Sequence, residues 1–98
     1  MKFVQFIELK SSKIDQVQAL DAEWEKATEG KRTVSRATIL ADRDVPNTYI
    51  LAVEFPSYED AMKNNELPET QRFAAEQAKL ADGPATFRNL DVIDDRTL

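Results

Sequence analysis

The sequence contains no cysteine and no histidine among its 98 residues. The absence of cysteine excludes disulfide bonds, thiolate catalysis and cysteine-bound zinc or iron–sulfur centres. The absence of histidine removes the commonest general base, the usual protein ligand of zinc and haem, and every nucleophile activated by an imidazole. We therefore expect no metal or haem bound through these residues.

Positive charge is also scarce, because 13 Lys and Arg residues stand against 18 Asp and Glu residues, for a net charge of −5. Such a chain lacks the basic footprint that neutralises phosphates, so nucleic acid is not an expected partner. The apolar run in "MKFVQFIELK" is too short for a membrane span and has no cleavage region, and no basic amphipathic segment indicates a membrane surface. We interpret the protein as cytoplasmic, with no membrane partner.

The length and the 42% hydrophobic content predict one compact domain over residues 1–98. Four segments have the composition of strands, namely residues 3–9, 33–41, 48–55 and 85–93. In the first segment Phe3, Ile7 and Leu9 fall on one face, and Val4 and Phe6 on the other. Because both faces are apolar, we expect each side of the sheet to be covered.

Helices are predicted between these strands. Ser12 and Asp15 resemble a capping box before an apolar stripe that ends near Gly30 (Ile14, Val17, Leu20, Trp24, Ala27), and Ser57 with Asp60 repeats the capping pattern. Pro68 is expected to break this later helix and to start another segment, whose stripe contains Phe73, Gln77 and Leu80.

The resulting order β-α-β-β-α-β predicts an α+β, ferredoxin-like fold, with a four-stranded antiparallel sheet that carries its helices on one face. The opposite face is too apolar to be left in water. We expect it to pack against the same face of a second copy, which makes a homodimer.

The segments "VQFIELK", "TYILAVEFPSYEDAMKNNELPET" and "DGPATFRNLDV" resemble those of the antibiotic biosynthesis monooxygenase (ABM) family of dimeric α+β barrels, in a bacterial branch. The resemblance covers nearly the whole chain. It implies one pocket per subunit between helices and sheet, and a small apolar or aromatic ligand. Similar proteins oxygenate polycyclic phenols without metal or flavin, through a deprotonated substrate that passes an electron to oxygen.

The resemblance also implies a site residue on the second helix. Asn65 is the best match to the family's helical asparagine, while the tryptophan that some members carry on this helix, and the histidine of haem-degrading members, have no counterpart. Asn65 can alternatively end the helix in the left-handed conformation. With Arg36 it would stabilise an oxyanion, and Tyr49 is the candidate base.

Other candidates each have a plainer alternative. Trp24 and Phe73 are predicted either to line the pocket or to belong to the core. Arg36 and Arg88 would meet an anionic ligand or pair with a carboxylate of Glu8, Glu54 or Asp91. Tyr49 can simply be packed at a strand end, and the "DAEWEK" charges form a solvated face. Gln5 is a cavity candidate, because it interrupts an apolar strand face.

Three functions follow from these features. The first is a cofactor-independent monooxygenase, or a related small-molecule enzyme, that acts on an aromatic or phenolic, polyketide-like compound. The second is a non-catalytic barrel for ligand binding or dimerisation. The third is a polyketide cyclase or isomerase, which would need a carboxylate such as Asp91 or Glu54 in the cavity.

Overall fold

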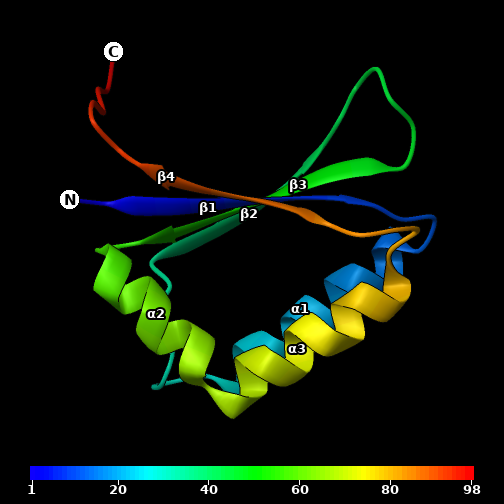
Figure 1. Cartoon of the computed structure of the whole chain (residues 1–98), viewed down its shortest axis with the longest axis horizontal. Coiled ribbons are helices and arrows are strands. Elements are labelled where there is room, and N and C mark those ends of the chain that lie inside the picture. The colour runs from blue at the N-terminus through cyan, green and yellow to red at the C-terminus, as the bar shows by residue number, and fades with distance from the viewer.

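The computed structural model describes residues 1–98, and in it three helices cover one face of a four-stranded antiparallel sheet (Figure 1). The sheet has the order β2-β3-β1-β4. Along the chain the elements are β1 (Phe3–Lys10), α1 (Ile14–Ala27), β2 (Arg36–Ala41), β3 (Thr48–Phe55), α2 (Tyr58–Glu66), α3 (Pro68–Leu80) and β4 (Thr86–Asp91). The predicted α+β ferredoxin-like plan is confirmed. None of the helices is long and apolar enough to cross a membrane.

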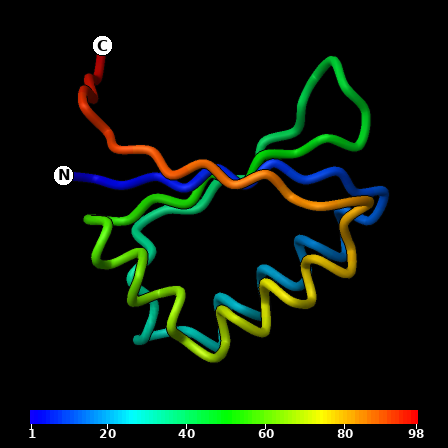
Figure 2. Tube along the Cα trace, in the orientation of Figure 1, coloured from blue at the N-terminus to red at the C-terminus, as the bar shows by residue number.

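The break between α2 and α3 is caused by Pro68, which disfavours the helical conformation at the preceding residue, Leu67. Leu67 has extended backbone angles (φ −64°, ψ 129°), and Pro68 is the first residue of α3. Asn65 lies inside α2, and the one non-glycine residue with a positive φ is Asn47, so a left-handed Asn65 does not end the helix. The chain bends at Leu67, and both helices thereby stay on the same side of the sheet (Figure 2).

The two predicted helix caps have different outcomes. Ser57 Oγ accepts from the backbone N–H of Asp60 at 3.1 Å, which confirms the cap of α2. The predicted cap of α1 by Ser12 is wrong, because the helix begins at Ile14 after Lys13, which forms no side-chain cap. Instead the Ser11 hydroxyl accepts from Lys13 N–H at 3.0 Å and donates to the carbonyl of Leu80 at 2.7 Å. This buried hydroxyl ties the start of α1 to the end of α3.

The edge strands β2 and β4 are shorter than predicted, since they begin at Arg36 and Thr86 and end at Ala41 and Asp91. Each of these strands pairs with a neighbour on one side only, so the backbone groups along its outer edge have no partner strand. The central strand β1 is paired along its length, with Ile7 opposite both Leu51 of β3 and Phe87 of β4.

The buried core is small and divided, because only 12 of the 98 residues are buried. One cluster, Phe3, Phe55 and Ala61, lies where α2 meets the sheet. The other, Ile7, Leu9 and Leu51, lies farther along the same strands. Gln5 stands between Phe3 and Ile7 on β1, so a polar position separates the two clusters.

Candidate functional site

A cavity of about 380 Å³ lies between the inner face of the sheet and the helices. Its size falls within the roughly 300–1,000 Å³ that is usual for small-molecule sites. All four strands and all three helices contribute to its wall, and 15 of the 24 lining residues are hydrophobic. The polar and charged lining residues are Gln5, Asp21, Thr38, Asn64, Asn65, Thr70 and Gln77. The cavity therefore suits an apolar ligand with a few polar groups.

Trp24 and Phe73 form one aromatic part of this wall. Their ring centroids are 6.0 Å apart across α1 and α3, at an interplanar angle of 45°. The Trp24 indole N–H donates to Thr70 Oγ1 at 2.9 Å. Both rings are half-buried, so they pack against each other and also face the cavity. The sequence left open whether Trp24 and Phe73 belong to the core or line the pocket. In the structure they do both.

Gln5 lies on the cavity wall, where it interrupts the inner face of β1. Its Nε2 donates to Asn89 Oδ1 of β4 at 3.2 Å. This contact holds the amide in place and leaves its carbonyl oxygen available to a ligand.

The two asparagines of α2 have different surroundings. Asn64 lines the cavity and is only 4% exposed, and its Oδ1 has no hydrogen-bond partner within the chain. Asn65 borders the cavity but is exposed, and its backbone carbonyl accepts from Gln71 Nε2 at 3.3 Å. The asparagine that the fold encloses is therefore Asn64, next to the predicted site residue Asn65.

Gln77 of α3 is a second buried amide with an unpaired oxygen. It is 7% exposed, and its Oε1 has no hydrogen-bond partner. An unpaired buried acceptor costs about 1–3 kcal/mol relative to a paired one, and native proteins contain few of them. Both unpaired acceptors belong to residues that line the cavity.

Asp21 of α1 is the one charged side chain in the cavity lining. Burial raises the pKa of its carboxyl group above the ordinary value of 3.8, and the negative charge of Glu25 adds to this rise. A carboxylate with a raised pKa is a stronger base than an exposed one. Asp21 is therefore equipped to accept a proton from a ligand.

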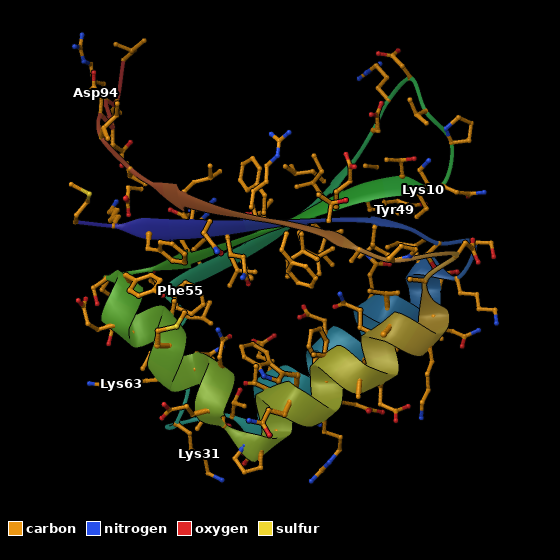
Figure 3. The ribbon with its side chains drawn as sticks, viewed as in Figure 1. Lys10, Lys31, Tyr49, Phe55, Lys63 and Asp94 are labelled. Carbon is orange, nitrogen blue, oxygen red and sulfur yellow. The ribbon has the colours of Figure 1, made fainter.

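Three predicted site residues lie outside the cavity lining. Arg36 is exposed, and its Nε lies 3.8 Å from Glu54 Oε2. It therefore forms the ion pair that was the alternative to binding an anionic ligand. Arg88 is exposed and pairs with Phe6 in the register of β4 on β1. Tyr49 does not line the cavity, and it lies at the other end of the sheet from Phe55, as the labels in Figure 3 show. Within one chain none of these three side chains lines the cavity.

Asp21, Asn64 and Gln77 fall outside the set predicted from the sequence. A usable sequence pattern exists for Asp21 and Gln77, because each interrupts a helical stripe of apolar residues. No pattern separates Asn64 from its neighbour Asn65.

The same fold occurs in several solved structures. SnoaB, a cofactor-independent oxygenase from Streptomyces nogalater, matches with a TM-score of 0.79 at 12% identity, over 96% of this chain and 95% of that chain. Rv0793 from Mycobacterium tuberculosis matches with a TM-score of 0.79 at 12% identity, over 99% and 100%. A structure described as an antibiotic biosynthesis monooxygenase matches with a TM-score of 0.74 at 16% identity, over 96% and 100%. No protein-family model and no curated protein matches the sequence. The chain thus has an ABM-like fold, in agreement with the resemblance of its sequence segments.

Proposed function

We propose that the chain binds a flat aromatic compound of phenol type in this cavity and oxygenates it without a cofactor. The observation that carries the proposal is an apolar cavity with one carboxyl group and enclosed amides on its wall. The fold shared with SnoaB supports it by analogy.

The reaction begins with proton removal. A base takes a proton from an activated C–H or O–H of the substrate, and the resulting anion passes one electron to dioxygen. The two radicals combine to form a C–O bond, and the peroxide then loses water to leave a carbonyl group. For a methylene carbon, the substrate loses two hydrogens and gains one oxygen, and the second oxygen atom leaves in water.

Several side chains have parts in this scheme. Asp21 is the base, because it is the only ionisable group on the wall. Asn64 presents an enclosed amide, whose Nδ2 can donate to an oxygen that develops negative charge. Trp24 and Phe73 provide apolar surface for an aromatic ring.

Oxygen consumption tests the proposal. Purified protein with a panel of anthrones and hydroquinones is expected to take up dioxygen in a one-to-one ratio to product, above the rate in buffer. Uptake no faster than buffer across the panel, combined with measurable binding, would instead favour a non-catalytic binding barrel.

A proton-transfer enzyme is the second candidate, and the position of Asp21 favours it. Neither Glu54 nor Asp91 lines the cavity, so the carboxylates predicted for a cyclase or isomerase are elsewhere. Asp21 supplies the carboxylate that such a reaction needs. Turnover that persists after dioxygen is removed would identify this activity and exclude the oxygenase.

We further propose that the protein is a homodimer through the outer face of the sheet. Leu40 and Leu90 are 45% and 38% exposed there, beside Val4, Phe6 and Ile50. The β2–β3 connection and the segment after β4 both rise on this side, opposite the helices (Figure 1). Together they flank this face of the sheet, which a second copy would cover.

The exposed area supports this assembly. A compact monomer of 11.1 kDa has an accessible surface of about 5,700 Å², whereas this chain exposes 6955 Å². The excess of about 1,300 Å², part of which belongs to the exposed segment after β4, exceeds the roughly 800 Å² per partner of a standard interface. Light scattering at micromolar concentration is expected to give twice the mass of the chain.

A further inference from the structure

The α1–α3 side of the cavity carries two side-chain acceptor groups, on Asp21 and Gln77. Gln77 Oε1 is buried and unpaired, and Asp21 contributes the one carboxyl group of the cavity lining. The Trp24 N–H, which is a donor on the same wall, is already engaged by Thr70. No lysine or arginine lines the cavity.

Helix packing places Asp21 and Gln77 on the same part of the wall. The contacts Ser11–Leu80 and Trp24–Thr70 show that α1 and α3 are antiparallel, because the start of one meets the end of the other. Asp21 lies about one turn from Trp24 toward the start of α1, and Gln77 about one turn from Phe73 toward the end of α3. Both therefore lie on the Ser11–Leu80 side of the aromatic pair.

We propose that Asp21 and Gln77 form an acceptor subsite that selects uncharged aromatic ligands with a hydroxyl or amino group and rejects aromatic carboxylates. The inference rests on the proposed use of this cavity as the ligand site, and it adds the substrate class. It applies to an oxygenase, an isomerase or a binding barrel alike.

The selectivity follows from unpaired groups and charge. A ligand O–H or N–H that donates to Gln77 Oε1 satisfies an acceptor that is unpaired in the free protein. A ligand carboxylate donates nothing, and its negative charge meets Asp21 in an apolar cavity without a counter-ion. One hydrogen bond of about 1.4 kcal/mol corresponds to a tenfold difference in dissociation constant.

Binding of two ligands of the same shape tests the subsite. 2-Naphthol and 2-naphthoate are titrated at neutral pH under nitrogen, with the fluorescence of the single tryptophan as the readout. We expect 2-naphthol to bind at least about tenfold more tightly than 2-naphthoate. Equal or tighter binding of the carboxylate, or no binding of either ligand at about 1 mM, overturns the proposal.

Two variants identify the residues responsible. Gln77→Met is expected to weaken 2-naphthol binding and to raise the melting temperature, because it replaces an unsatisfied buried amide by an apolar side chain of similar size. Asp21→Asn is expected to reduce the discrimination against 2-naphthoate. Gln18→Met and Asp15→Asn, at exposed positions of α1, are the matched controls and should change neither ligand's binding.

The results separate this inference from the proposed activity. Unchanged ligand preference in both folded variants overturns the subsite, whether or not oxygen uptake is observed. The expected preference without oxygen uptake supports the subsite and overturns only the oxygenase. If Gln77→Met does not fold, the comparison of the two ligands on the unaltered protein, together with Asp21→Asn, still decides the question.

Discussion

Trp24 of α1 donates its indole N–H to Thr70 Oγ1 of α3 over 2.9 Å, and this bond joins two helices next to the cavity. Trp24 is the only tryptophan of the chain, so its fluorescence reports on this wall. The bond also fixes the edge of an aromatic ring that faces the cavity. Loss of this hydrogen bond should therefore lower the stability of the protein and free the Trp24 ring at the cavity wall to move.

Thr70→Val tests this relationship. Valine has nearly the shape of threonine but cannot accept a hydrogen bond, so Trp24 Nε1 loses its partner. We expect the free energy of unfolding to fall by about 1–2 kcal/mol, with a changed tryptophan emission maximum. Urea denaturation followed by fluorescence measures both, and Thr70→Ser, which keeps the hydroxyl, is the control. If the serine variant is destabilised as much as the valine variant, the hydrogen bond is not the cause.

The carboxyl group of Asp21 predicts a pH dependence of stability. Burial first, and the charge of Glu25 second, raise its folded-state pKa above the ordinary 3.8. In the window between 3.8 and the raised pKa, the folded state binds more protons than the unfolded state. The contribution of Asp21 to stability therefore decreases as pH rises through this window and remains unfavourable above it.

Asp21→Asn removes this titration. At neutral pH the variant is expected to be more stable than the unaltered protein, because an amide avoids burying a negative charge. The difference should shrink as the pH is lowered toward 3.8, where Asp21 becomes protonated. Urea denaturation at several pH values measures the difference, with Asp15→Asn as the exposed control. A difference that grows on acidification would show the opposite sign for the pKa shift.

The fold could be predicted from the sequence because its strongest patterns are local. The strand β3 has the predicted bounds, Thr48–Phe55, and Pro68 breaks the helix as its missing N–H requires. The ends of β2 and β4 were less predictable, since edge strands end where the neighbouring strand stops pairing. Local composition carries no information about that neighbour.

The site was less predictable, because it depends on small rotations of a helix. Asn64 and Asn65 differ by 100° around α2, and only the way α2 lies on the sheet decides which of them is enclosed. Asp21 was assigned to a solvated face because charged residues follow it in "DAEWEK". Its helical spacing from Val17 and Trp24, which share the apolar stripe, was the better indicator that Asp21 faces the cavity.

Substitution of the two asparagines tests which of them serves the site. We expect Asn64→Ala to lower the turnover of any accepted substrate about 100-fold or more, as loss of an oxyanion donor does. Its stability should change by less than about 1 kcal/mol, because removal of an unpaired buried acceptor offsets the packing lost around this enclosed side chain. Asn65→Ala is the matched control, and as an exposed position it should change stability by under about 0.5 kcal/mol. A larger loss of turnover in Asn65→Ala would restore the assignment made from the sequence.

Phe6→Glu tests the proposed dimer. Phe6 lies on β1 opposite Ala52 and Arg88, in the middle of the outer face of the sheet and away from the cavity. Two glutamates brought together at a symmetric interface would bury like charges, so the dimer should dissociate. Light scattering is expected to give the mass of one chain, while Gln18→Glu, which adds the same charge to an exposed part of α1, should stay dimeric. If Phe6→Glu remains a dimer, the outer face is not the interface. If it becomes a monomer that still binds 2-naphthol, each cavity is complete within one chain.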